Sequence, residues 1–73
     1  MPKMSETGRS LSVVESECIA LLANGRDVPA IARELELPPH IVERQLDSAR
    51  DALGAKSRLH AVILAIAMRD LGG

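Results

Sequence analysis

Side chains that can form charge-assisted hydrogen bonds gather on one face of the segment 39–53. With a helical period of about 3.6 residues, the polar face of this segment carries His40, Glu43, Arg44, Asp47, Arg50 and Asp51. An arginine such as Arg44 can pair with phosphate or bond a guanine edge at two points, and carboxylates can accept hydrogen bonds from cytosine amino groups. His40, at the start of the segment, can touch phosphate or face water. These residue types support recognition of double-stranded DNA.

The charge of the chain weighs against strong duplex binding. Lys and Arg number 9 and Asp and Glu number 10, which gives a formal net charge of −1, whereas duplex-binding domains ordinarily carry a basic excess. Glu43 and Asp47 lie one turn apart and would meet phosphate with like charge. Arg44 and Arg50 can offset this in part. The same face therefore also fits an ordinary solvated surface of mixed charge.

Composition argues against several other classes of function. The chain contains no Phe, Tyr or Trp, so it has no aromatic platform for base stacking. Cys18, the lone cysteine, excludes an internal disulfide and is expected to be a small core side chain. Cys18, His40 and His60 fall at no zinc-site spacing. Since no nucleophile, base and orienting group fall together either, we expect no enzyme, no metal and no cofactor.

Helix starts can be located from capping residues. Ser12 and Glu15 form an S-x-x-E capping box, and Asp27 and Ser57 can each cap a further helix. Residues 1–10 lack any apolar periodicity, so they are expected to be a disordered tail before a domain over 11–71.

Helix ends follow from glycine and proline. Asn24-Gly25 and Gly54 supply left-handed stops, and Leu37-Pro38-Pro39 forbids a continuous helix. The sequence thus predicts an all-α fold with helices over 12–23, 28–36, 39–53 and 57–71. The residues expected to be buried in the first three helices are Val14, Cys18, Leu21, Leu22, Val28, Ile31, Ala32, Leu35, Val42, Leu46, Ala49 and Leu53.

The last helix contains the longest apolar run of the chain. Ala61 to Met68 is eight residues, far below the roughly 20 that cross a bilayer, and the chain does not start like a signal peptide. No membrane partner and a cytoplasmic location are therefore expected. Because a small domain cannot cover such a helix on every side, we expect a homodimer or heterodimer interface. Its candidate residues are Leu59, Ile63, Ile66, Ala67 and Leu71.

A family pattern runs through most of the predicted domain. It comprises Leu11-Ser12, Glu15, Glu17, Leu21-Leu22-Ala23, Gly25, Ile31-Ala32, Leu35, Val42, Leu46, Leu53-Gly54, Lys56-Ser57-Arg58 and Ala61-Val62. With these residues the chain resembles the LuxR-type, GerE-like DNA-binding domain over residues 11 to about 67. The resemblance implies a four-helix domain whose second and third helices form a helix-turn-helix. It also implies that the third helix reads the major groove and that the fourth supports dimer formation.

The chain departs from this family at several contact positions. The family usually has Lys at Glu43, His at Gln45 and a basic or small polar residue at Asp47, while Arg44 falls at a variable base-contacting position. The family commonly has Lys at the position of Pro29 and Arg at the position of Val14, and this chain has neither charge. Lys56 and Arg58 keep the usual type and join Arg44 and Arg50 as the principal expected DNA contacts.

Two functions from different classes follow. The first is a small stand-alone LuxR-type transcriptional regulator that docks its third helix in the major groove, as a dimer through its fourth helix. The alternative is a DNA-incompetent helix-turn-helix variant that binds and modulates another LuxR-type regulator, an antiactivator. A fragment of a longer regulator is also compatible with the sequence.

Overall fold

The chain folds into four α-helices. The computed structural model describes the backbone of residues 10–72 and the side chains of residues 10–67. The helices are α1 (Val13–Ala23), α2 (Val28–Leu35), α3 (Pro39–Leu53) and α4 (Arg58–Gly72), and residues 10–72 contain no strand. The expected all-α class is confirmed, and each helix boundary agrees with the prediction to within one residue. The tail predicted over 1–10 lies, apart from Ser10, outside the described residues.

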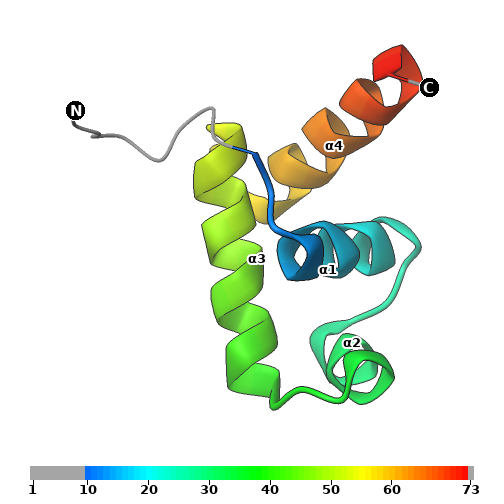
Figure 1. Ribbon diagram of the computed structural model, residues 1–73, viewed down its shortest axis with the longest axis vertical. Coiled ribbons are helices and arrows are strands. Elements are labelled where there is room, and N and C mark those ends of the chain that lie inside the picture. Colours follow the sequence, from blue (N-terminus) through cyan, green and yellow to red (C-terminus); the bar gives the residue numbers. More distant parts are fainter. Residues whose placement is uncertain (1–9, 73) are drawn as a thin grey trace.

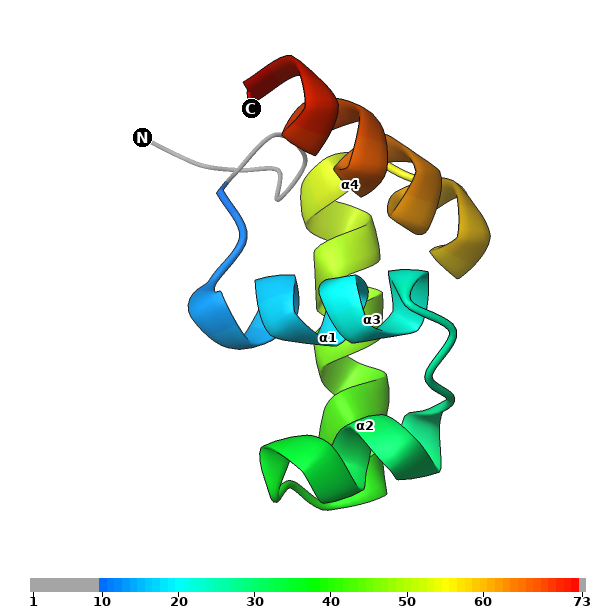
Figure 2. The ribbon, with the colours of Figure 1, turned by 90° about the vertical axis from the view of Figure 1, so that its right-hand side faces the viewer.

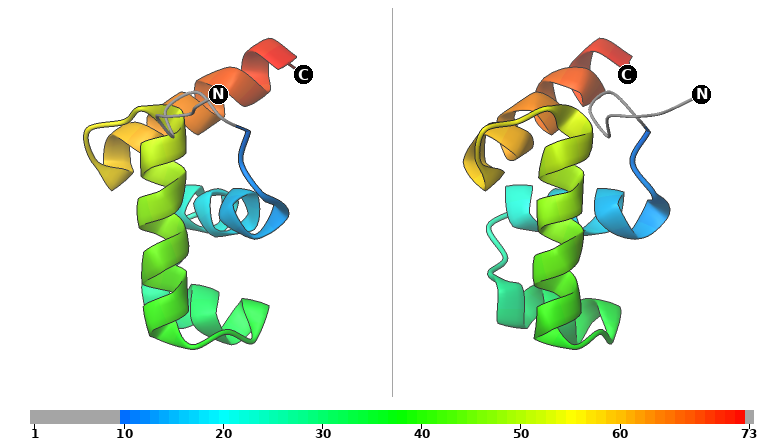
Figure 3. Two further views of the ribbon diagram at one scale, coloured as in Figure 1. Left: turned by 60° about the vertical axis from the view of Figure 1, so that its left-hand side comes forward. Right: turned by 90° about the vertical axis from the view of Figure 1, so that its left-hand side faces the viewer.

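Helix α3 is the axis of the molecule. Helices α2, α1 and α4 follow one another along one side of α3 (Figures 1 and 2). α4 packs on α1 and α3 but, among the described residues, not on α2. The opposite side of α3 is covered by no described helix (Figure 3, right). The fold therefore leaves one long side of α3 open.

The predicted helix starts are confirmed. The Ser12 hydroxyl accepts from the N–H of Glu15 at 3.1 Å, and the Ser12 N–H donates to Oε1 of Glu15 at 2.9 Å. Asp27 Oδ1 accepts from Ala30 N–H at 3.0 Å, and the Ser57 hydroxyl accepts from His60 N–H at 3.0 Å. Each bond pairs an amide that has no partner within its helix.

Three helices end on a left-handed residue, and only two of these are glycine. Gly25 (φ 91°) and Gly54 (φ 68°) adopt positive φ as expected. After α2 the same role falls to Glu36, with φ 57° and ψ 46°. Leu37 N–H donates to Ala32 O at 2.9 Å and Glu36 N–H to Arg33 O at 3.3 Å, the bond pair of a Schellman motif. This left-handed residue was not predicted, because glycine is the usual residue at such a position.

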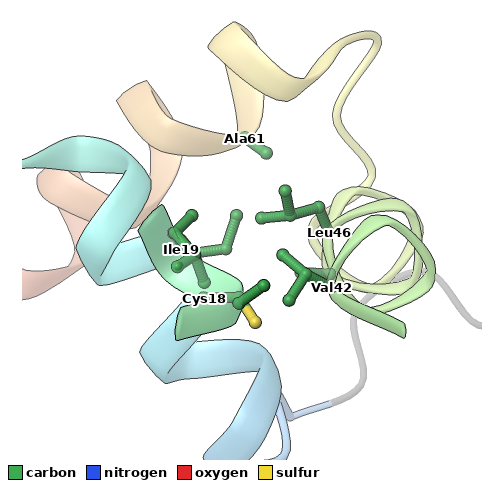
Figure 4. Close-up of a cluster of buried hydrophobic side chains, with 8 residues drawn as sticks. Cys18, Ile19, Val42, Leu46 and Ala61 are labelled. Atoms are coloured by element: carbon green, nitrogen blue, oxygen red, sulfur yellow. The ribbon is translucent and has the colours of Figure 1, made fainter. Parts of the chain in front are cut away.

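The core lies between α3 and the three helices packed on it. Cys18 and Ile19 of α1, Val42 and Leu46 of α3, and Ala61 of α4 meet there (Figure 4). Ile31, Ala32 and Ala49 complete the buried cluster, while Val28, Leu35, Leu21 and Leu22 are partly buried against it. Most of the predicted core is therefore confirmed.

One position of the predicted core is wrong. Val14 is exposed, and the buried face of α1 runs through Glu15, Cys18 and Ile19 instead. Glu15 can lie on this buried face because its carboxylate accepts a hydrogen bond from Ser48 of α3. In α3 the predicted Leu53 is partly buried against the core, and the sequence prediction missed Ala52, which is buried in the last turn.

Candidate nucleic-acid interface

The open side of α3 carries the charged residues singled out in the sequence. His40, Glu43, Arg44, Asp47 and Asp51 are all exposed and recur with helical spacing. We call these five residues the α3 outer face. No described helix stands in front of it (Figure 3, right). Arg50 is half-buried at its margin. The structure therefore places the predicted α3 residues together on one accessible surface.

Arg58, the first residue of α4, reaches across to this face. Its Nη2 lies 2.6 Å from Oε1 of Glu43 and 2.9 Å from Oδ1 of Asp47. Its Nε donates to the same Asp47 oxygen at 3.3 Å, and Nη2 also donates to the main-chain oxygen of Glu43 at 3.3 Å. One guanidinium thus joins two carboxylates of α3 to the start of α4. We call Glu43 and Asp47 the acid pair.

The cluster formed by Arg58 and the acid pair is partly open to water. The side chains of Glu43 and Asp47 are 49% and 51% exposed, and that of Arg58 is 33% exposed. Burial by itself lowers the pKa of Arg58, but hydrogen bonds and charge from Glu43 and Asp47 together raise it above its usual value. Water screening keeps the stability gained from such exposed pairs modest, typically under about 1 kcal/mol each. The cluster matters more for the charge presented to a ligand than for stability.

The other expected cations divide into paired and unpaired. Arg50 Nη2 lies 3.2 Å from Oδ1 of its neighbour Asp51. Arg44 and Lys56 are exposed and have no ion pair within the described residues. The backbone N–H of Lys56 donates to Nδ1 of His60 at 3.0 Å, which fixes the loop before α4. Positive charge is therefore most available at Arg44 and Lys56.

Sequence reasoning did not find the roles of Arg58 and Glu15. It placed Arg58 among the DNA contacts and did not pair it with the acid pair. Two carboxylates one turn apart were the available signal, because like charges at that spacing favour a nearby cation. Glu15 was assigned to the capping box, but its burial and its bond from Ser48 of α3 were not expected.

Helix α4 exposes an apolar stripe. Leu59, Ile63 and Ile66 are 70%, 54% and 42% exposed, and Ala67 is exposed beside them. We call these four residues the α4 stripe. Leu71 falls in α4, but its side chain lies outside the described residues. An apolar groove of about 420 Å³ between α1, α3 and α4 includes Ile66 in its lining. The exposure expected for an all-round apolar helix is thus present.

Two further properties bear on the site. Within residues 10–72, none of the helices combines the length and apolar character that crossing a bilayer needs. Among the side chains of residues 10–67, no group of three His, Cys, Asp or Glu is suited to hold a metal ion.

Comparisons of the chain with family models, with curated proteins and with solved structures find no match. The class of protein must therefore be argued from the arrangement of α2, α3 and α4 and from the residues that they expose.

Proposed function

We propose that the chain is a transcriptional regulator in which α2 and α3 form a helix-turn-helix and the α3 outer face enters the major groove of DNA. The observation that carries this proposal is the side of α3 that no described helix covers, together with Arg44, an exposed residue of α3 that has no ion pair among the described residues. The short turn from Glu36 to Pro38 and the resemblance to LuxR-type domains support it.

The residues of the interface take different roles in this proposal. Arg44 bonds a guanine edge at two points, which is worth about 1 to 3 kcal/mol of discrimination. Lys56 pairs with phosphate. His40 lies at the N-terminus of α3, which approaches the DNA backbone in this proposal. The oxygens of Glu43 and Asp47 that do not face Arg58 accept hydrogen bonds from cytosine amino groups.

Pairing through the α4 stripe completes the proposed regulator. Exposed aliphatic side chains along one helix fit a two-fold contact between copies of the chain. Such a dimer binds half-sites about one helical turn, roughly 34 Å, apart. The regulator works in the cytoplasm without catalysis.

Selection from a randomised duplex pool at low salt, followed by fluorescence anisotropy on the retained sequence, tests the DNA-binding proposal. Wild type is expected to enrich a sequence and to bind it with an affinity that falls as salt rises. Arg44→Lys keeps the charge but loses the two-point contact, so it should lose sequence discrimination while keeping the salt slope. Failure of wild type to enrich any sequence, together with absence of salt-dependent binding, would defeat the proposal.

A second candidate function rests on the acid pair and the α4 stripe. A chain that repels phosphate but pairs through α4 would weaken a LuxR-type regulator by forming a mixed dimer with one poor recognition helix. The purified chain would then lower operator binding by such a regulator, and Leu59→Glu with Ile63→Glu would abolish the effect. If the chain binds duplex by itself and leaves the regulator's operator affinity unchanged, this candidate fails.

A further inference from the structure

Arg58 differs from the other cations of the interface because it pairs with both carboxylates of the acid pair. We infer that Arg58 neutralises the acid pair from within the protein and positions the first turn of α4 on α3, and that it is not a phosphate ligand. The inference rests on the proposed function, because it concerns the charge that the α3 outer face presents to DNA.

The hydrogen bonds of the guanidinium are the first argument. Nη2 faces three acceptors, which are Oε1 of Glu43, the main-chain oxygen of Glu43 and Oδ1 of Asp47. Nε donates to the same Asp47 oxygen. Of the five N–H groups of a guanidinium, those on Nη2 and Nε thus face acceptors on α3. A two-point contact with phosphate would require Arg58 to give up part of this set.

The negative charge that Arg58 neutralises also keeps it from phosphate. If Arg58 moved onto phosphate, Glu43 and Asp47 would face the polyanion without their nearest cation. Both side chains are about half exposed on the open side of α3, so their repulsion would act directly on an approaching duplex. Arg44 and Lys56 have no ion pair to break among the described residues. They are therefore the cations that can meet phosphate without uncovering a carboxylate.

A double-mutant cycle measured through DNA affinity tests the inference. Arg58→Gln is made in wild type and in a Glu43→Gln, Asp47→Asn background, and binding to a mixed-sequence duplex of about two helical turns is followed between about 50 and 200 mM salt. In the neutral background the amide oxygens and the main-chain oxygen at position 43 still accept from Arg58. We expect Arg58→Gln to weaken binding on the order of tenfold in wild type and by less than about twofold in the neutral background.

Lys56→Gln is the matched control, because Lys56 is an exposed cation two residues away. If Lys56 is a phosphate ligand, Lys56→Gln should lower the salt slope by about 0.9 in both backgrounds. Arg58→Lys should recover much of the wild-type affinity, since it restores a charge beside the acid pair. Circular dichroism of each variant separates loss of binding from loss of fold.

The outcomes distinguish failure of the inference about Arg58 from failure of the proposed DNA-binding function. A slope lowered by about 0.9 on Arg58→Gln in the neutral background would make Arg58 a phosphate ligand and overturn the inference. Binding by the neutral background without binding by wild type would show that Arg58 does not neutralise the acid pair, which also overturns it. Absence of salt-dependent binding by both proteins would defeat the proposed function itself.

Discussion

The hydroxyl of Ser48 on α3 donates a hydrogen bond to Oε2 of Glu15 on α1. The other oxygen of the same carboxylate accepts from the backbone N–H of Ser12 at 2.9 Å, and Glu15 is only 4% exposed. One carboxylate therefore closes the capping box of α1 and fixes α1 against the helix that carries the proposed interface.

Ser48→Ala is expected to lower the free energy of unfolding by about 1 to 3 kcal/mol, because it leaves a buried carboxylate oxygen without this hydroxyl. Urea unfolding followed by far-ultraviolet circular dichroism measures the change, which suits a chain without Trp or Tyr. Ser16→Ala, at an exposed site on α1, should change stability by less than about 0.5 kcal/mol. Equal effects of the two substitutions would contradict a structural role for the Ser48 to Glu15 bond.

Glu36→Gly is expected to raise the free energy of unfolding by about 1 kcal/mol. Glu36 adopts φ 57° and ψ 46°, a conformation that costs an L-residue about 1 to 2 kcal/mol and glycine little. The same substitution at the exposed Glu17 inside α1 should instead destabilise by about 1 kcal/mol. Thermal or urea unfolding of both variants checks the opposite signs, and destabilisation by both would refute the strain at Glu36.

Leu59→Glu combined with Ile63→Glu is expected to convert the proposed dimer to a monomer without unfolding it. Both side chains are more than half exposed in the isolated chain, so charges there cost little unless a partner covers them. Analytical ultracentrifugation over a range of concentrations measures the effect. Val13→Glu, at a 74% exposed apolar residue on α1, should leave the oligomeric state unchanged. A monomeric wild type at all concentrations would rule out the dimer.

Cys18 predicts a loss of stability at alkaline pH. Burial, followed by the nearby charges of Glu17 and Glu15, raises the pKa of the Cys18 thiol above its usual 9.0. The folded state therefore binds the thiol proton more tightly than the unfolded state does. The contribution of this thiol to the free energy of unfolding is complete below about pH 9 and falls as the pH rises toward the folded pKa. In that window the free energy of unfolding should drop by up to about 1.4 kcal/mol per pH unit.

Cys18→Ala is the control for this titration. It should lose some stability at neutral pH, because it shrinks a fully buried side chain, but it should lack the additional decline above pH 9. With no Tyr in the chain, phenol ionisation does not overlap the measurement. An identical alkaline decline in both proteins would assign it to other groups.

Local chemistry made the helices predictable from the sequence. The bonds at Ser12, Asp27 and Ser57 join residues three apart, and Gly25 and Gly54 need only their own backbone freedom. Interactions of such short range depend on the residue types nearby and not on how helices cross. The polar face of α3 followed from helical period alone. The resemblance to LuxR-type domains and the functions drawn from it stay predictions.

Only the tertiary structure decided which charges meet. Arg58 is 11 residues from Asp47 along the chain, and Ser48 is 33 residues from Glu15. Whether such side chains touch depends on where α1 and α4 cross α3, and a rotation of one residue along a helix turns a side chain by about 100°. That geometry brought Glu15 inside in place of Val14, and it set Arg58 against the acid pair, while Arg44 and Lys56 have no ion pair among the described residues.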